Sequence, residues 1–548
     1  MSRLTDKNLP HSDHSSGSYY IHECSFVDLD ERRRAALAEI DNSRFGWYHL
    51  RACIILGMGF FTDSYSLFII DLVGVLLAWT YFSTHNLPTS LDIVVKMSAL
   101  LGVVLGQIMF GWLADHAGRK KVYGIEILLI IIATLGQSLS GSSLTLPIWA
   151  AIAFWRVVLG IGIGGDYPLS AIITSEFATA SRRGAMVAAV FVMQGFGILA
   201  ASIVSITLLF IYHEGLSATP PDPASLEMCW RLLIGLGAIP AVASIYFRFT
   251  IPETPRFTMD VEGRVTKGAK DATAFLARGT AAGDYDEADL HEQTQLPKAS
   301  LSDFVAYFRQ WKNGKIFLGT AVSWLLLDVT FYGLSLNSSL LLEAVGFTTG
   351  ENVTNTLYYT SLGNIIICLL GGIPGYWTAV FTMDKLGRRT IQLIGFGMLA
   401  VIYIIMGALF TFLSSVNVIV FLFLFILVQF FYNFGPNATT FIIPSEIFPT
   451  RYRCLCYGIS ATSGKLAAIF VQVGISHTHV HFGFASLIDK LFIAFGCLMF
   501  VGFLITLALI PETKGKTLEE LSNEVQYDFV VQSHQRRVNG TAVHHGTV

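Results

Sequence analysis

The chain has 548 residues, of which 53% are hydrophobic and 14% are charged, whereas soluble domains carry roughly 25% charged residues. With a mean hydropathy of +0.57, this composition excludes a water-soluble globular protein, because the surplus apolar surface needs lipid as its solvent. The net charge of −3 argues against a nucleic-acid partner. We find no nucleophile–base pairing and no set of metal ligands, so an enzyme is the least favoured class.

Twelve apolar runs approach the 20 residues that a helix needs to cross a bilayer. They lie near residues 50–79, 94–114, 122–141, 148–175, 184–212, 230–250, 315–342, 357–382, 389–412, 416–444, 454–475 and 487–510. The predicted fold is therefore an all-α integral membrane protein with 12 transmembrane helices. No cleavable signal peptide is visible, because the first forty-odd residues are polar and charged.

Basic residues fall on alternate loops. The loops near 80–93, 142–147, 212–229, 343–356, 413–416 and 476–489 contain neither Lys nor Arg, whereas the other connections are basic. The positive-inside rule places the basic connections and both termini in the cytoplasm. In the absence of an organellar transit peptide, this topology favours the plasma membrane.

Three motifs recur in the same order in the two halves of the chain. They are D-x-x-G-R-[KR] at 115–120 and 384–389, Ser-Glu followed by arginines at 175–183 and 445–453, and Ile-Pro-Glu-Thr at 251–254 and 510–513. This repeat implies two pseudo-symmetric six-helix bundles, the build of a secondary transporter whose site lies between its halves. The predicted domains are a cytoplasmic N-terminal segment (1–46), an N-terminal bundle (47–250), a cytoplasmic central loop (251–313), a C-terminal bundle (314–511) and a cytoplasmic tail (512–548). In the central loop, SDFVAYFRQW (302–311) is typical of a surface helix that lies under the membrane.

The stretch GIGIGGDYP (160–168) has the G-x-G-x-x-G spacing of a dinucleotide-binding loop. It lacks the preceding strand, and its acid directly follows the last glycine instead of lying about 20 positions on. We interpret the glycines as a close contact surface for a neighbouring span and as a point at which the helix bends at mid-membrane. The bend would aim Asp166 and Tyr167 inward.

Charged groups at span depth are costly and therefore functional candidates. Those well inside spans are Asp63, Asp166, Asp328 and Lys465. Lys96, Asp71 and Glu126 are expected near the interfaces, where long side chains reach water. Arg156 lies ten residues before Asp166 on the same span and either reaches the cavity or pairs with an acid.

The internal repeat relates these groups in pairs: Asp63 with Asp328, Asp166 with Asn437, and Gln194 with Lys465. One axis between the halves would bring them toward a common cavity. Trp324, Asp328 and Tyr332 are four residues apart and so lie on one helix face. A cavity rich in donors suits a small oxyanion, and because ionised carboxylates repel an anion, the anion is expected to bind together with protons.

D-x-x-G-R-[KR], PETPR and PETKG resemble motifs of the major facilitator superfamily. GIGIGGDYPLSA, GFFTDSYSLF, WLLLDVTFYG, YNFGPNATTF and SGKLAA together resemble the proton-coupled phosphate symporters of fungi and plants, over about residues 45–520. The resemblance implies a major facilitator fold that imports inorganic phosphate with protons by alternating access.

The resemblance also implies roles for individual residues. The phosphate-binding positions are Tyr167, Gln194, Trp324, Asp328, Tyr332, Asn437 and Lys465. The acids assigned to proton movement are Asp63, Asp166 and Asp328. A gating role away from the substrate falls to Asp115, Arg119, Asp384 and Arg388. The expected partners are phosphate, protons and the lipid bilayer, with no cofactor and no metal, and the oligomeric state stays open.

Other functions compete with phosphate symport. PETPR and PETKG also favour a sugar porter, but sugar porters carry a Gln-rich patch in the seventh span, where this chain has Asp328 between aromatic residues. Transport of organic ions or glycerophosphodiesters fits the same residue types. A phosphate receptor that signals with or without flux is a further alternative.

Overall fold

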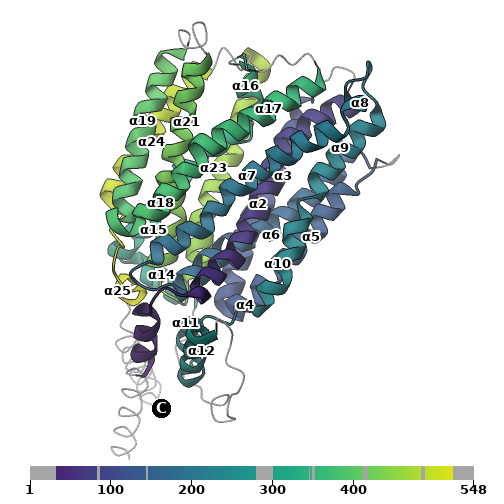
Figure 1. The fold of residues 1–548 in the computed structure, drawn as a ribbon. Helices are drawn as coiled ribbons and strands as arrows, with labels where there is room; N and C mark the ends of the chain where they lie inside the picture. Colours follow the sequence, from purple (N-terminus) through teal and green to yellow (C-terminus); the bar gives the residue numbers. More distant parts are fainter. Residues whose placement is uncertain are drawn as a thin grey trace, which may run out of the picture.

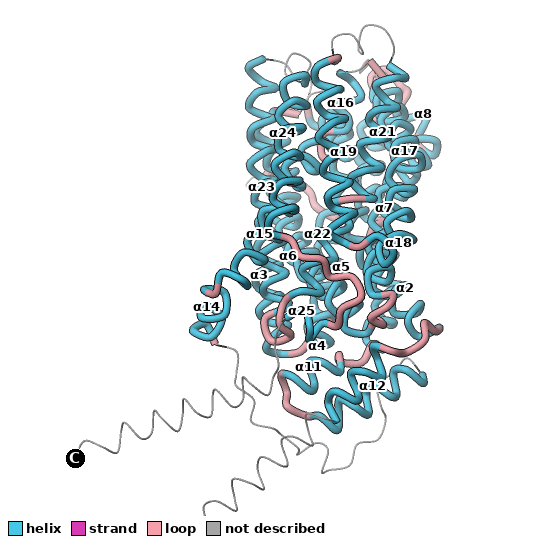
Figure 2. The backbone as a smooth tube through the Cα atoms, turned by 90° about the vertical axis from the view of Figure 1, so that its left-hand side faces the viewer, coloured by secondary structure: helices cyan, strands magenta, loops and turns pink. Residues whose placement is uncertain are grey.

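The computed structural model describes residues 32–82, 87–142, 146–278, 300–344, 346–347, 352–410, 418–482 and 488–522. Every regular element in these ranges is a helix (Figure 2). Twelve helices among them are long and apolar enough to cross a membrane. The predicted all-α membrane fold with twelve spans is therefore confirmed.

Six spans make up each half of the chain. Those of the first half are α2 (Trp47–Tyr81), α3 (Thr89–Ala117), α4 with α5 (Arg119–Tyr123, Ile125–Ser138), α6 (Ile148–Phe177), α7 (Arg183–Ile211), and α9 with α10 (Pro223–Gly235, Ala238–Thr250). Those of the second half are α15 (Trp311–Ser335), α17, η1 and α18 (Val353–Ile367, Cys368–Gly372, Ile373–Leu386), α19 (Arg388–Ala408), α21 with α22 (Val418–Phe434, Pro436–Ile447), α23 (Arg453–Phe482) and α24 (Ile488–Leu509).

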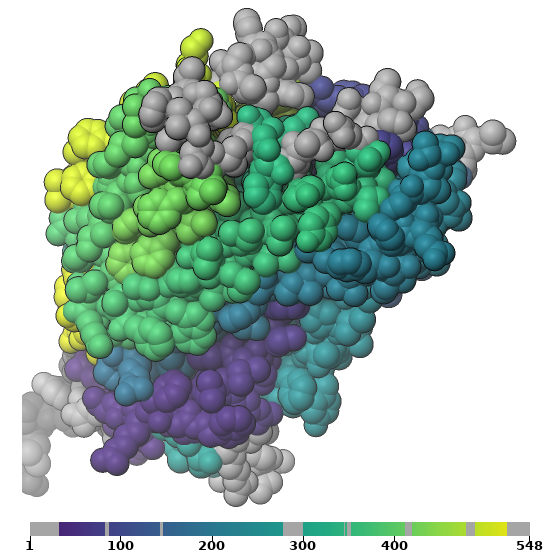
Figure 3. All heavy atoms as spheres, turned by 45° about the horizontal axis from the view of Figure 1, so that its top comes forward, coloured from purple at the N-terminus to yellow at the C-terminus, as the bar shows by residue number. Residues whose placement is uncertain are grey.

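Short helices lie at both ends of the bundle (Figure 1). The end that carries α11 (Pro255–Asp260), α12 (Val265–Arg278), α14 (Leu301–Arg309) and α25 (Leu518–Ser522) is called the lower end. The opposite, upper end carries α8 (His213–Leu216) and α16 (Ser338–Ala344). In Figure 3, first-half helices in purple and blue and second-half helices in green lie on separate sides of the molecule.

Helices α3 and α6 pack closely through glycines. A Cβ atom at Gly160 would lie 2.1 Å from the carbonyl oxygen of Ala99, and one at Gly102 would lie 2.1 Å from that of Val157. The close contact predicted for GIGIGGDYP is thus present. Helix α6 is continuous from Ile148 to Phe177, with Pro168 inside it, so the glycines and the proline do not interrupt the helix, and the bend at mid-membrane stays a prediction. Tight packing against α3 supports the helix at this point.

The internal repeat of the sequence is also a repeat of contacts. Gly118 and Gly387 both have a positive φ, 105° and 97°, which glycine adopts without steric cost. Glu253 accepts hydrogen bonds from the amides of the two residues after Gly118, both of 3.1 Å. Glu512 accepts the same pair after Gly387, at 2.9 and 3.2 Å. In each half, the Pro-Glu-Thr motif therefore caps the helix that the D-x-x-G-R motif begins.

Candidate functional site

A buried ion pair lies between α15 and α23. The Nζ atom of Lys465 is 2.7 Å from Oδ2 of Asp328, and the two side chains are 2% and 3% exposed. The same Nζ lies 4.6 Å from the ring centroid of Tyr332 and 5.3 Å from that of Tyr167. Tyr167 belongs to α6 of the first half, so this ammonium group contacts side chains from both halves.

The predicted shared face of α15 is confirmed. Trp324, Asp328 and Tyr332 are all buried. A Cβ atom at Gly464 would lie 2.5 Å from the Asp328 carboxylate and 2.7 Å from the Trp324 ring. Glycine at this place on α23 lets the polar face of α15 lie directly against the helix that carries Lys465.

The two predicted amides, Gln194 of α7 and Asn437 of α22, are also buried. Asn437 donates to Oδ1 of Asn433 at 2.8 Å and to the hydroxyl of Tyr376 at 3.1 Å. The side-chain oxygen of Gln194 has no hydrogen-bond partner among the described residues. Sequence analysis identified neither Asn433 nor Tyr376. The spacing of four residues before Asn437 is a signal that could have found Asn433, whereas nothing in the sequence singles out Tyr376.

A second cluster of charges lies within the first half. Arg248 pairs with Glu126 at 2.5 Å and with Asp166 at 2.9 Å, and all three side chains are fully buried. Ser170 donates to the other oxygen of Asp166 at 2.6 Å. The guanidinium of Arg248 also lies 4.2 Å from the ring centroid of Tyr123.

This second cluster corrects three expectations. Arg248 was not identified from the sequence, so Lys465 is not the single cation at this depth. Glu126 does not reach an interface, because its side chain is fully buried beside Arg248. Asp166 faces Arg248, whereas its neighbour Tyr167 faces Lys465, so the two adjacent residues serve separate clusters.

Asp63 lies on α2 beside the second cluster. It is fully buried, and neither carboxylate oxygen has a hydrogen-bond partner among the described residues. One turn away, a Cβ atom at Gly59 would lie 2.1 Å from Oδ2 of Asp166, so α2 passes directly against the cluster. An ionised carboxylate buried without a partner costs several kcal/mol, which makes Asp63 a suitable place for a proton.

Arg156 stands apart from both clusters. Its Nε donates to the carbonyl oxygen of Val95 at 2.8 Å, and the side chain is 1% exposed. It makes no salt bridge within the described ranges, so the predicted pairing with an acid is not found there. Nor do the described residues contain a group of His, Cys, Asp or Glu side chains suited to a metal ion.

Aromatic rings close the lower side of the site. The rings of Phe191 and Phe441 stack at 4.4 Å, and that of Phe60 lies 5.6 and 5.0 Å from them. Each ring lies about one helical turn nearer the lower end than Gln194, Asn437 and Asp63 do. Because the rings come from both halves, their contact separates the site from the lower end.

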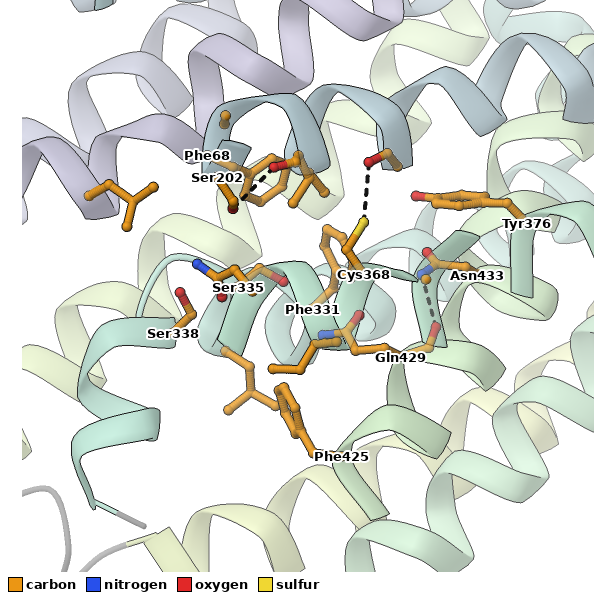
Figure 4. Close-up of a pocket in the computed structure, with 18 residues that line it drawn as sticks. Phe68, Ser202, Phe331, Ser335, Ser338, Cys368, Tyr376, Phe425, Gln429 and Asn433 are labelled. Atoms are coloured by element: carbon orange, nitrogen blue, oxygen red, sulfur yellow. Dashed lines mark hydrogen bonds between the residues drawn. The ribbon is translucent and has the colours of Figure 1, made fainter. Parts of the chain in front are cut away.

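A cavity of about 70 Å³ reaches Ser335 and Ser338 at the upper side of the site, and Figure 4 shows the residues that line it. It is lined by helices of both halves, and its polar lining residues are Ser202, Ser335, Ser338, Asn364, Tyr376, Gln429 and Asn433. None of the seven predicted phosphate-binding residues lines it. Tyr376 and Asn433 connect it to them, since both bond to Asn437.

At the lower end, each half caps a helix of the other. Asp115 accepts from the amides of Cys454 and Leu455 at the start of α23, at 3.2 and 2.8 Å. Asp384 accepts from the first amides of α7, those of residues 184 and 185, at 3.1 and 2.9 Å. A carboxylate at a helix N-terminus is favoured by the unpaired amides and by the helix dipole. We call these two contacts, together with the arginines described next, the lower gate.

Arginines extend the lower gate. Arg119 donates to the carbonyl oxygen of Thr450 at 2.7 Å, and Arg453 pairs with Glu176 at 2.8 Å. Arg388 pairs with Asp384 at 2.8 Å and with Glu446 at 2.7 Å. Arg256, just after the first half, pairs with Glu519 of the tail at 2.9 Å and with Asp41 before α2 at 3.0 Å. The halves are therefore joined by ion pairs and by caps.

The upper end also carries contacts between the halves. Asp71 of α2 accepts from the hydroxyls of Ser338 and Ser339, both at 2.8 Å. Lys96 of α3 donates to Asn337 at 3.2 Å and lies 3.1 Å from Asp92. Lys96 and Asp71 are 5% and 3% exposed, so they do not reach water as expected. We call this set the upper gate.

The sequence profile of the family described as "Sugar (and other) transporter" matches residues 52–525. The chain is 44% identical over 529 residues to the repressible high-affinity phosphate permease of Neurospora crassa, with 92% of each protein covered. It is 41% identical to the inorganic phosphate transporter PHO84 of Saccharomyces cerevisiae, with 94% of this chain and 91% of that protein covered.

Solved structures share the fold. A structure of the proton:xylose symporter XylE with a bound bromodeoxyglucose, described as a protein of the major facilitator superfamily, has a TM-score of 0.66 at 23% identity and covers 87% of this chain and 98% of its own. The inward open conformation of XylE from E. coli gives 0.57 at 22% identity, covering 87% and 99%. These likenesses show the fold, and the predicted major facilitator architecture is confirmed.

Proposed function

This chain belongs to the sugar and other transporter family, and from that premise we propose that it imports inorganic phosphate together with protons across the plasma membrane by alternating access. In this proposal the lower end and both termini lie in the cytoplasm, as the distribution of basic residues predicts. The buried pair of Lys465 and Asp328 carries the proposal, because it places the Lys465 ammonium group between the halves together with tyrosines of both.

The phosphate site is proposed to form by exchange of partners at Lys465. Without substrate, Asp328 neutralises the ammonium group at 2.7 Å. A proton taken up by Asp328 removes its charge, so that Lys465 becomes available to an anion and the protonated carboxyl can donate to it. The remaining proposed ligands are the hydroxyls of Tyr167 and Tyr332, the indole of Trp324, and the amides of Gln194 and Asn437.

The proton site is proposed to be the second cluster. Three buried carboxylates, those of Asp63, Glu126 and Asp166, lie in this cluster with one guanidinium group, that of Arg248, which pairs with Glu126 and Asp166. When all three are ionised the cluster carries two excess negative charges, which a low-dielectric interior opposes. Uptake of a proton relieves this excess, and Asp63 is the acid without a partner among the described residues.

Alternating access would require the two gates to open in turn. The lower gate, with Asp115, Arg119, Asp384 and Arg388, holds the halves together on the cytoplasmic side. Inward release of phosphate would break these contacts and separate the aromatic rings above them. Outward opening would break the upper gate at Asp71. Arg156 borders α3 near the upper gate and is not assigned a ligand role.

Uptake of radiolabelled phosphate into proteoliposomes tests the proposal. We expect accumulation when the outside is acidic, and loss of accumulation when a protonophore collapses the gradient. Phosphate uptake that does not depend on the proton gradient would contradict symport. If a sugar or a glycerophosphodiester competed for uptake and unlabelled phosphate did not, that result would favour those compounds as the substrates. A variant without flux that still supports phosphate signalling in cells would favour a receptor.

A further inference from the structure

Helix α14 exposes large apolar side chains beside the spans. Leu301 and Val305 are 79% and 56% exposed and lie four residues apart on the same face. The other short helices at the lower end, α11, α12 and α25, leave no large apolar side chain exposed within the described ranges. Figure 2 shows α14 at the side of the bundle, beside the lower end of α15.

The side of α14 that carries Asp303, Phe304, Tyr307 and Phe308 is less exposed, adjoins the positions of Leu301 and Val305, and is fixed to the protein. Phe304 and Phe308 pack against a small apolar cluster that includes Phe448 and Tyr452. The Tyr452 hydroxyl donates to Oδ2 of Asp303 at 2.6 Å. The helix is therefore held in a defined orientation, in which Leu301 and Val305, beside the packed side, stay exposed.

The exposed face of α14 continues the lipid-facing surface. Trp311 and Leu318, on the span that follows at once, are 69% and 48% exposed. Tryptophan is enriched where a span meets the headgroups. Arg309 ends α14 and Lys312 lies in the first turn of α15, and both are exposed. The acid of α14, Asp303, is engaged by Tyr452 and by Arg451 at 3.4 Å.

We propose that α14 is an interfacial helix whose Leu301 and Val305 insert among the lipids of the lower leaflet, while Arg309 and Lys312 bind anionic headgroups. An amphipathic helix with basic residues at its edge binds an anionic bilayer through apolar burial and charge attraction together. The continuity with Trp311 favours lipid over a protein partner. This inference is independent of the transported substrate.

Helix α14 also contacts the connection between α22 and α23. Tyr452 bonds to α14, while its neighbours contact the first half: the carbonyl oxygen of Thr450 accepts from Arg119, and Arg453 pairs with Glu176. Lipids that fix the position of α14 therefore also restrain the connection between α22 and α23, which supplies the second half's contacts with Arg119 and Glu176 in the lower gate.

A fluorescent probe at Val305 tests the proposal. The probe is attached to V305C in full-length protein in which Cys24 and the exposed Cys497 are replaced by serine. Exposed Thr273 on α12, as T273C, is the matched control. The protein is placed in phosphatidylcholine nanodiscs with and without phosphatidylserine, and nitroxide-bearing lipids serve as quenchers.

We expect severalfold stronger quenching at position 305 than at position 273. Phosphatidylserine should increase the quenching at 305, and R309Q/K312Q should remove that increase without removing quenching altogether. Equal quenching at the two positions would overturn the proposal. So would a blue-shifted, unquenched probe at 305 that persists in detergent, because that result would show a second copy or another segment of protein on this face. An increase that R309Q/K312Q leaves intact would overturn the headgroup contact.

Discussion

Asp115 and Asp384 occupy equivalent places in the two halves, and each caps the first turn of a helix in the opposite half. The motif that the sequence repeats is therefore used reciprocally, so that neither half can tilt at the lower end without uncapping a helix of its partner. A carboxylate at such a position contributes about 0.3–1 kcal/mol, and up to about 2 kcal/mol where it is partly buried.

Asp115→Asn should loosen the lower gate. The amide keeps one acceptor but loses the charge that faces the amides at the start of α23, so we expect up to about a tenfold shift toward the inward-open state. Distances between spin labels at exposed Lys121 and Lys385 measure the shift. Asp384→Asn is the symmetric control and should act in the same direction. Unchanged distance distributions in both variants would contradict the gating role.

Lys465→Ala should abolish phosphate binding while leaving the protein folded and inserted. The substitution removes the ammonium group beside Tyr167 and Tyr332 and leaves Asp328 buried without its partner. Binding is measured by calorimetry on the purified protein, and circular dichroism reports the fold. Asp328→Asn is the companion variant: it keeps Lys465 available and should bind phosphate with a weaker dependence on acid. Undiminished binding by Lys465→Ala would refute its assigned role.

Asp166→Asn should separate substrate binding from proton coupling. The acid faces Arg248 and not Lys465, so phosphate exchange across the membrane should persist while accumulation against a gradient is lost. Removing one partner of a buried pair costs about 3–5 kcal/mol, so thermal stability should be measured in parallel. Arg248→Gln should lose accumulation as well. Full accumulation by Asp166→Asn would show that this cluster does not carry the proton.

The ion pair between Arg256 and Glu519 should make the tail contact insensitive to physiological pH. Burial alone would raise the pKa of Glu519, but the Arg256 guanidinium outweighs it and lowers the pKa to about 2, from an ordinary value of 4.5. Because the folded-state pKa is lowered, the pair contributes fully above pH 4.5 and is lost only as pH falls toward 2. Hydrogen exchange of α25 should therefore be flat from neutral pH down to about 5 after correction for intrinsic rates, and faster in Glu519→Gln. A rise in exchange between neutral pH and 5 would contradict this assignment.

Gly160→Ala should destabilise the first half. The added Cβ would lie 2.1 Å from the Ala99 carbonyl oxygen, and overpacking of this kind costs about 1–3 kcal/mol. Gly74 on α2 has no atom within 4 Å of such a Cβ, so Gly74→Ala is the matched control and should be neutral or stabilising. Thermal unfolding in detergent compares the two. Equal melting temperatures would show that α3 and α6 do not need the close contact.

The fold was predictable because several independent features of the sequence, described next, indicate the same architecture. Hydropathy marks each span, and the repeated motifs relate the two halves before any contact is known. The face of Trp324, Asp328 and Tyr332 was predictable from helical spacing alone. Asp115 and Asp384 could be recognised as gating candidates, but the reciprocal caps could not, because their partners are backbone amides of helix starts that the sequence does not single out.

Arg248 shows where the sequence is insufficient. It lies two residues before the end of α10, where an arginine ordinarily reaches the headgroups, and the repeat gives it no polar counterpart. Only packing turns it inward, toward Glu126 and Asp166. Packing also explains why α6 stays continuous: the glycines that weaken a helix alone also allow α3 to support it.

The most direct test of the central claim is a measurement of proton movement on addition of phosphate. Proteoliposomes containing the protein and an internal pH indicator receive phosphate outside, with no imposed gradient. The account predicts internal acidification that needs phosphate, is abolished by Lys465→Ala, and is absent in Asp166→Asn even though phosphate still exchanges. Phosphate uptake without acidification in the unmodified protein would contradict it.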